Sequence, residues 1–370
     1  MAKPFTIDVP KAKLDELHKR IDKAHFPEAP ANAGWGYGAS EDYMKELVKY
    51  WRHEYDWRAA EEKLNELDHF MAEIDGTKIH FIHQKSSNAN ATPLLLIHGW
   101  PDSFYRFHKV IPMLSEKFDV IVPSLPGFGF SDHVAMNSSQ TADVFAKLMR
   151  NELGYKDFVV SSGDIGTDIA RALATNHEEL VKGVHLTDAG YPNGSEDFTT
   201  MTPEEQAFAG KCQGWWYTEG AYNLMQSTKP QTISFALADS PVGLAAWMVE
   251  KFEAWTDGGI EKALSKDEIL TNITLYYVTD TIASATRTYA ENARAAYATG
   301  RPQPTKKIEV PTAIAAFPAE MVPTIKPWAE RSANVVRFSK IPKGGHFGAL
   351  EQPKLFASDV IEFVESLQGL

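Results

Sequence analysis

The sequence contains a single cysteine, Cys212, among 370 residues, so it can form no internal disulfide and no cysteine-rich metal site. It has no run of about 18 apolar residues, and its polar first residues offer no apolar segment of signal-peptide length. We therefore expect a soluble cytoplasmic protein without a membrane partner, with an exported protein that lacks disulfides as the alternative. No glycine-rich phosphate loop, cluster of metal ligands or Gly-x-Ser-x-Gly motif occurs, which indicates that no cofactor is required.

The sequence also has fewer positively charged than negatively charged residues. The 37 Lys and Arg residues are outnumbered by 49 Asp and Glu residues, which gives a formal net charge of −12. A negative surface repels nucleic acid and anionic membranes, so neither is expected as a partner. With 44% hydrophobic residues, the chain can bury a sizeable core, arranged as one large domain or two.

Residues 158–174 contain the motif from which the rest of the sequence is interpreted. Their apolar, β-branched start predicts a buried strand, and residues 168–174 predict a helix. Between them lies Asp164, with small residues two positions before it, Ser162, and two positions after it, Gly166. This is the spacing of a nucleophile elbow, where small neighbours avoid a clash between strand and helix. The simpler interpretation is that Asp164 only caps the helix.

Strands and helices alternate around this stretch, which predicts an α/β fold with a mostly parallel central sheet and right-handed crossovers. Continuous apolar runs indicate that strands are covered on both faces. We expect further strands at residues 93–101, 118–123, 181–188, 310–317 and 334–338. We expect helices at residues 11–23, 41–55, 59–70, 141–153 and 354–367, and a hairpin with an Asp-Gly turn at 75–76.

The alternation stops in one aromatic-rich segment, residues 191–302, which we interpret as a helical cap inserted over the sheet. The alternative is that these aromatic residues form the core of a second helical domain. The chain then divides into an N-terminal extension that wraps the core at 1–74, a first part of the core at 75–190, the cap, and a second part of the core at 303–370.

Two candidate catalytic side chains follow the last strands. Glu320 comes after the strand at 310–317, and His346 comes after the strand at 334–338, behind two glycines. The carboxyl ends of parallel strands meet at one edge of the sheet, so both should face the crevice that holds Asp164. The chain order nucleophile, acid, histidine is that of a hydrolase triad. Two other histidines, His80 and His83, lie on opposite faces of one strand and are interpreted as ordinary strand residues.

An aspartate nucleophile determines the chemistry. Attack on a carbonyl would give an anhydride, whereas attack on an electrophilic sp³ carbon gives an ester that water can cleave. His346 would activate this water and Glu320 would orient the imidazole, while the backbone N–H groups of Trp100 and Ile165 form an oxyanion hole. Epoxides and haloalkanes both fit this scheme.

The sequence resembles epoxide hydrolases of the α/β-hydrolase fold, especially the branch with the microsomal and juvenile-hormone enzymes. The resemblance runs over nearly the whole chain. It rests on the N-terminal segment (Trp-Gly-Tyr-Gly at 35–38, Tyr-Asp-Trp-Arg at 55–58) and on four motifs: His-Gly-Trp-Pro at 98–101, Gly-Asp-Ile-Gly at 163–166, Phe-Pro-Ala-Glu at 317–320 and Gly-Gly-His-Phe at 344–347. The family implies a cis peptide bond before Pro101.

The resemblance also implies two cap tyrosines that hydrogen-bond the epoxide oxygen and act as the acid on ring opening. By local match these are Tyr222 and Tyr289, and the nearby Tyr217 is a decoy. The chain departs from the family at Ile165, where tryptophan is common; this reshapes the pocket but leaves the backbone N–H in place. The membrane anchor of the microsomal relatives is absent, which implies a soluble hydrolase with a role in detoxification.

The expected substrates are a hydrophobic epoxide and water, and the expected product is a vicinal diol. Two alternatives remain. A haloalkane dehalogenase would use the same carboxylate and histidine but must stabilise a halide with N–H donors. A catalytically silent binding protein could also adopt this fold. A homodimer is left open.

Overall fold

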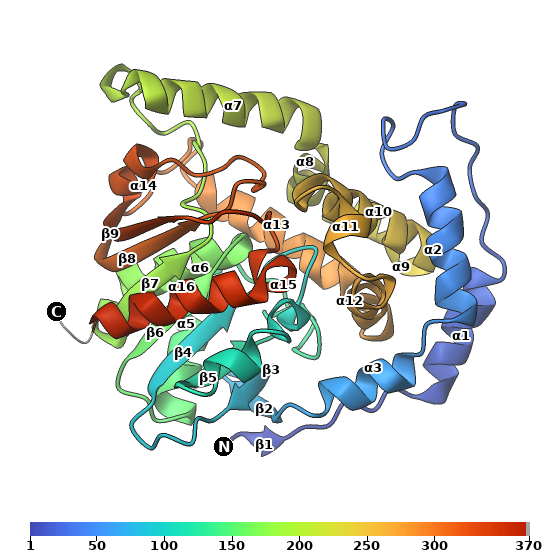
Figure 1. The fold of residues 1–370 in the computed structure, drawn as a ribbon, viewed down its shortest axis with the longest axis horizontal. Coiled ribbons are helices and arrows are strands. Elements are labelled where there is room, and N and C mark those ends of the chain that lie inside the picture. Colours follow the sequence, from blue (N-terminus) through green and yellow to red (C-terminus); the bar gives the residue numbers. More distant parts are fainter. Residues whose placement is uncertain (368–370) are drawn as a thin grey trace.

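The computed structural model of the protein describes residues 1–367. Nine strands form one sheet in the order β1-β2-β3-β5-β4-β6-β7-β8-β9 (Figure 1). The pairs from β1 to β5 are antiparallel, and all pairs from β5 to β9 are parallel. The predicted α/β fold with a mostly parallel sheet is confirmed.

The strands are β1 (Lys3–Pro4), β2 (His69–Ile74), β3 (Thr77–Gln84), β4 (Thr92–Ile97), β5 (Phe118–Pro123), β6 (Phe158–Ser162), β7 (Val181–Leu186), β8 (Ile308–Ala316) and β9 (Ala333–Lys340). The first helices along the chain are α1 (Lys11–Ile21), α2 (Glu41–His53) and α3 (Trp57–Leu64). The helices around the sheet are α4 (Ile111–Leu114), α5 (Ser138–Lys147), α6 (Ile165–Asn176), α14 (Lys326–Ser332), α15 (Gly348–Glu351) and α16 (Pro353–Ser366). The helices over the sheet are α7 (Pro203–Glu219), α8 (Ala221–Thr228), α9 (Pro230–Asp239), α10 (Pro241–Trp255), α11 (Ile260–Ala263), α12 (Lys266–Val278) and α13 (Ile282–Ala296). Short turns are η1 (Phe104–Phe107), the π-helical η2 (Leu148–Glu152), η3 (Glu178–Leu180) and η4 (Phe198–Thr200).

The central strands are apolar throughout because helices cover both faces of the sheet. In β4, Leu95 and Ile97 pack into the core beneath α5 and α6, whereas Leu94 and Leu96 pack into the core beneath α4 and α16. Successive side chains of a strand point to opposite faces, so a strand covered on both sides needs an unbroken apolar run. The unbroken apolar run at residues 93–97 is therefore explained by burial on both faces of the sheet.

The helices α7–α13 lie beyond the carboxyl ends of the parallel strands, as Figure 1 shows. The helices α1–α3 pack beside them, mainly against α10 and α12. Trp51 of α2 is fully buried there and donates its indole N–H to the hydroxyl of Thr274, 3.0 Å away. The segment boundary expected at residue 74 falls inside the β2–β3 hairpin, whose turn has Asp75 and Gly76 at positive φ. The division of the chain into four segments stays a prediction.

The helix expected at residues 59–70 was wrong at both ends. It begins at Trp57, after Asp56 caps its first N–H groups, and it ends at Leu64. The chain then enters β2, where the ring of His69 is bonded to the carbonyl of Leu64 and to the ring of His80. Pairing of β2 with β3 overrides the local helical pattern, because a strand beside β3 satisfies a whole row of backbone groups.

Candidate active site

Asp164 lies on a tight turn between β6 and α6, with φ 60° and ψ −137°. A non-glycine residue rarely adopts this conformation, and a strained turn of this kind is characteristic of functional sites. Two glycines allow the close packing. A Cβ on Gly166 would lie 2.6 Å from the carbonyl oxygen of Ile97, and a Cβ on Gly99 would lie 2.1 Å from Oδ1 of Asp164.

The carboxylate of Asp164 is held between two sets of donors. Its Oδ1 accepts the backbone N–H of Trp100 at 3.0 Å and the backbone N–H of Ile165 at 2.7 Å. Its Oδ2 lies 3.1 Å from Nε2 of His346. The two N–H groups predicted as an oxyanion hole therefore converge on one oxygen, and the second oxygen faces the histidine. The peptide bond between Trp100 and Pro101 is cis, as the resemblance implied.

His346 and Glu320 approach from two neighbouring strand ends. Glu320 follows β8, His346 follows β9, and a parallel bridge between Ala319 and Gly345 fixes the two loops side by side. Nδ1 of His346 donates to Oε1 of Glu320 at 2.7 Å. Both side chains are buried. The structure thus brings the predicted nucleophile, base and acid into one hydrogen-bonded row.

The charges in this row depend on one another. Burial lowers the pKa of His346, but the carboxylates of Glu320 and Asp164 outweigh burial and raise it above its usual value. Burial raises the pKa of Asp164, yet the hydrogen bond and charge of His346 and the two backbone N–H groups hold it below its usual value. The raised pKa favours the protonated form of His346 in the resting site.

The two predicted cap tyrosines come together above the carboxylate. Tyr222 of α8 stacks on the indole of Trp100 with ring centroids 5.3 Å apart, and Tyr289 of α13 meets the same indole edge-on at 6.0 Å. Burial raises the pKa of both phenols well above the usual value, and the charge of Asp164 adds to this. Both tyrosines therefore stay protonated donors at neutral pH. Tyr217, by contrast, is 94% exposed.

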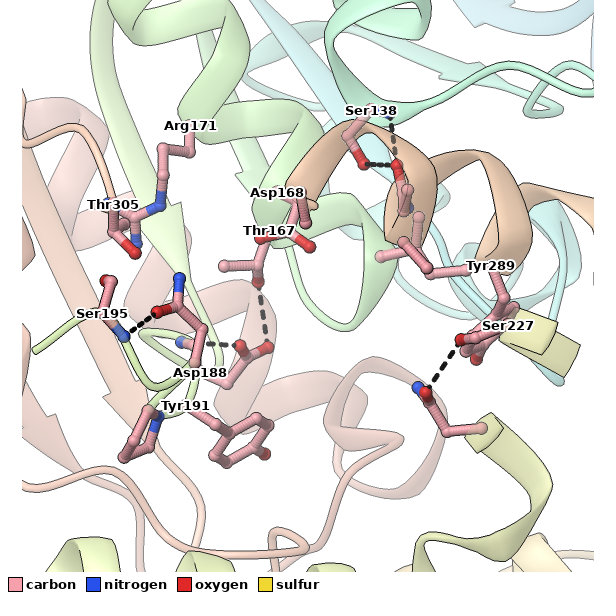
Figure 2. A pocket seen from close by; sticks show the side chains of 18 of the residues that line it. Ser138, Thr167, Asp168, Arg171, Asp188, Tyr191, Ser195, Ser227, Tyr289 and Thr305 are labelled. Carbon is pink, nitrogen blue, oxygen red and sulfur yellow. Dashed lines mark hydrogen bonds between the residues drawn. The ribbon is translucent and has the colours of Figure 1, made fainter. Parts of the chain in front are cut away.

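Asp188 is a site residue that the sequence reading missed. It follows β7, and its buried Oδ2 accepts the backbone N–H of Asp164 and the hydroxyl of Thr167, both at 2.9 Å (Figure 2). Its Oδ1 accepts the N–H of Gly190 at 3.1 Å. Burial and the nearby charge of Glu320 raise the pKa of Asp188 to about 6. Asp188 thus holds the strained turn that presents the nucleophile.

Replacement of Asp188 by alanine should slow ester formation about tenfold, because the buried N–H of Asp164 loses its acceptor and the turn shifts. Asp188→Asn keeps an amide oxygen at this position and should recover most of the rate. Rapid-mixing single-turnover kinetics with an epoxide measures this step. Equal rates in wild type and Asp188→Ala, with an unchanged melting temperature, would remove Asp188 from the positioning of the nucleophile.

Two further carboxylates, one half-buried and one buried, hold the loops of the site. Glu351 accepts the backbone N–H groups of Asp257, Gly345 and Phe347, which fixes the loop that carries His346. Asp102 accepts the N–H of Gly99 and a guanidinium hydrogen bond from Arg106. The same guanidinium also donates to the carbonyl of His346. No sequence motif marks these carboxylates. Gly99, Gly345 and Phe347 lie three to six residues from the carboxylate that they bond, whereas the fold alone brings Asp257 to Glu351 and His346 to Arg106.

A cavity of about 1030 Å³ opens onto the carboxylate of Asp164. Its walls include both tyrosines and the apolar side chains of Trp215, Trp216, Leu224 and Met321. Among residues 1–367, no three His, Cys, Asp or Glu side chains are grouped so that they could hold a metal ion. Over the same residues, no single helix is long and apolar enough to cross a membrane; α9 and α10 pass this test only together and are bent by 116°.

Two family models match the chain. Residues 2–107 match the model described as "Epoxide hydrolase N terminus", and residues 92–247 match the model described as "alpha/beta hydrolase fold". Together the two matches run from residue 2 into α10. The core strands β4–β7 and the turn at Asp164 lie within the second match.

Proteins of similar sequence and structure carry related names. A protein of Stigmatella aurantiaca, provisionally named an epoxide hydrolase, is 40% identical over 99% of this chain and 85% of its own length. Epoxide hydrolase 1 of Oryctolagus cuniculus is 35% identical over 98% of this chain and 88% of its own. The solved structure of Aspergillus niger epoxide hydrolase superposes with a TM-score of 0.87 at 29% identity, covering 99% and 97% of the two chains. The juvenile hormone epoxide hydrolase of Bombyx mori gives 0.86 at 31% identity, covering 100% and 95%.

Proposed function

Because the chain belongs to the epoxide hydrolase family, we propose that it converts an epoxide and water into a vicinal diol through an ester on Asp164. One observation carries this proposal: a buried aspartate, bonded to His346 and through it to Glu320, lies beneath two protonated tyrosines in a single cavity. A carboxylate nucleophile suits an sp³ carbon, and phenol donors suit a leaving oxygen that becomes an alkoxide.

In the first step, Oδ2 of Asp164 attacks a ring carbon while Oδ1 stays bound to the two backbone N–H groups. The carbon–oxygen bond of the ring breaks, and the ring oxygen takes a proton from Tyr222 or Tyr289. The product is a hydroxyalkyl ester of Asp164 and a tyrosinate. Both phenols are buried, and a low-dielectric surrounding strengthens their hydrogen bonds to the ring oxygen.

Formation of the ester removes the negative charge of Asp164. One of the carboxylates that raised the pKa of His346 is then gone, so the imidazolium can release the proton that the tyrosinate takes up. Neutral His346 next removes a proton from a water molecule, which adds to Cγ of the ester. Negative charge develops on Oδ1, where the N–H groups of Trp100 and Ile165 stabilise it. Collapse of this intermediate breaks the bond between Cγ and Oδ2, and the departing diol oxygen takes the proton of the added hydroxyl group. This step leaves Asp164 as a carboxylate and releases the diol.

A single turnover in oxygen-18 water tests the mechanism. With enzyme in excess over styrene oxide, the diol should contain no label, because its new oxygen comes from the Asp164 carboxylate. The peptide that contains Asp164 should carry the isotope instead. Labelled diol in the first turnover would show direct attack by water, and the proposed ester would be excluded.

A haloalkane dehalogenase is the alternative with a supporting observation. The indole N–H groups of Trp100 and Trp255 are buried and have no hydrogen-bond partner among residues 1–367, and such groups can bind a halide. Neither indole lines the main cavity, however, whereas Tyr222 and Tyr289 do. Bromide release from a bromoalkane, without diol from an epoxide of equal chain length, would favour the dehalogenase. Absence of both products would favour a silent binding protein.

We also propose that the epoxide has an apolar body, since aromatic and aliphatic side chains line much of the cavity. Buried Cys212 is compatible with a cytoplasmic location, which stays a prediction. A homodimer and a role in detoxification also remain predictions from the sequence.

A further inference from the structure

A buried lysine on α10 lies against the ring of Tyr222. Lys251 is 5% exposed, and its ammonium lies 4.7 Å from the ring centroid of Tyr222 and 5.9 Å from that of Trp255. The ammonium pairs with the carboxylate of Glu250, and Lys251 does not line the substrate cavity. Lys251 can therefore influence the reaction only through the side chains that it contacts, and Tyr222 is the one that faces the substrate.

The two phenols of the site differ in their surroundings. Among residues 1–367, a lysine lies over the ring of Tyr222, but no lysine or arginine lies over the ring of Tyr289. Burial raises the pKa of both phenols, but the hydrogen bond between them lowers the pKa of Tyr222 and raises that of Tyr289. The cation and the hydrogen bond from Tyr289 therefore both favour ionisation of Tyr222.

Ring opening creates negative charge on the phenol that gives up its proton. When Tyr222 protonates the ring oxygen, its O–H bond and the ring carbon–oxygen bond break, and a tyrosinate remains. The negative charge spreads over the aromatic ring, so the ring attracts the ammonium of Lys251 more strongly than the neutral phenol does. A contact that strengthens as the charge develops lowers the barrier of this step and leaves substrate binding unchanged.

We propose that Lys251 is a positioning residue that selects Tyr222 as the proton donor for ring opening, because its ammonium stabilises the tyrosinate. Tyr289 keeps its proton in this step and contributes a hydrogen bond. The inference rests on the proposed function and assigns a further residue to its first step. The tyrosinate of Tyr222 then regains a proton from His346, as described above.

A cycle of double variants tests the proposal. The rate of ester formation with styrene oxide is measured by mass spectrometry in the His346→Gln background, where hydrolysis is blocked. Lys251→Met keeps an unbranched apolar side chain but removes the charge, and it should slow this step about tenfold. Adding Tyr222→Phe should reduce the effect of Lys251→Met to about twofold or less, whereas adding Tyr289→Phe should leave it near tenfold. Lys251→Arg restores a cation and should recover most of the rate.

Lys13→Met is the matched control. Lys13 on α1 lies 5.4 Å from the ring centroid of Tyr277 and pairs with Asp280, so it makes the same two kinds of contact outside the cavity lining. Its replacement removes the same charge and should leave ester formation unchanged. Equal slowing by Lys251→Met with and without Tyr222→Phe would show that Lys251 acts through packing, and this result would overturn the proposal.

Glu250→Gln gives a test of opposite sign. Burial is the main cause of the raised pKa of Tyr222, and the carboxylate of Glu250 raises this pKa further. Loss of that charge should therefore speed ester formation by about threefold. If Glu250→Gln instead slowed the step as much as Lys251→Met does, the ion pair would act as a structural unit, and the role of the cation would be overturned.

Titration of the phenol at position 222 gives a readout that does not depend on turnover. The probe is 3,5-difluorotyrosine in place of Tyr222, because its phenol ionises at lower pH and its ionised form has a distinct absorbance. The pKa of this phenol should rise by about 1 in Lys251→Met and stay unchanged in Lys13→Met, at equal melting temperatures.

The outcomes separate this inference from the proposed function. An unchanged pKa of the fluorinated phenol in Lys251→Met, while the wild type still converts styrene oxide into its diol, would overturn the role of Lys251 alone. Absence of the diol with the wild type would overturn the proposed function. The part of Lys251 in proton transfer would then fall with it, even if the pKa rises in Lys251→Met.

Discussion

Replacement of His346 by glutamine is expected to trap the ester on Asp164. Incubated with styrene oxide, His346→Gln should gain the mass of one whole epoxide, while steady-state diol formation falls by about 10³-fold. Asp164 can still attack, because the N–H groups of Trp100 and Ile165 keep its carboxylate in place. The ester then persists because no base remains 3.1 Å from the former carboxylate oxygen to activate water. Intact-mass spectrometry over time measures the adduct.

Two variants make this result specific. The double variant Asp164→Asn, His346→Gln should form no adduct, because its amide is a poor nucleophile. His83→Gln alters another buried histidine, on β3, which is bonded to Tyr155 and lies outside the site. It should turn over normally and accumulate no ester. If wild type forms diol but His346→Gln shows no adduct, then His346 acts before or during ring opening, and its assignment as the base for hydrolysis is wrong.

Removal of both phenols should have the second large effect. Tyr222→Phe and Tyr289→Phe should each slow ring opening about 10²-fold, and the double variant should slow it by about 10⁴-fold, since no proton donor then faces the leaving oxygen. A single remaining phenol supplies part of the function because both rings meet above Trp100. The rate of ester formation in the His346→Gln background isolates this step from hydrolysis.

Tyr217→Phe is the control for these variants. Tyr217 lies five residues before Tyr222, yet it is 94% exposed and does not line the cavity, so its loss should leave the rate unchanged. Loss of the phenols should matter less for a bromoalkane, because bromide leaves without a proton. Ester formation at the wild-type rate in the double variant would show that the leaving oxygen receives its proton from another group.

The sequence pattern predicted secondary structure well where buried side chains recur at a regular spacing along the chain. The strands β4–β9 and the helices α5, α6 and α16 were expected near their actual positions, because apolar runs and helical periodicity record which faces are covered. The pattern gave the wrong element where strand pairing with another segment determines the secondary structure. The Asp-Gly turn at 75–76 predicted the β2–β3 hairpin, but the helical pattern before it did not show that β2 already begins at His69 or that β1 pairs with β2.

Patterns along the chain were enough to predict the α/β fold, the order of Asp164, Glu320 and His346, and the resemblance from which the two tyrosines were inferred. Strand ends in a parallel sheet meet at one edge, so the order of the motifs already implies a common site. The folded structure was needed to identify the groups that hold this site and the side chains that line its cavity. The hydrogen bond from the backbone N–H of Asp164 to Asp188 depends on which groups from neighbouring strand ends come within bonding distance, and no local pattern predicts such a distance.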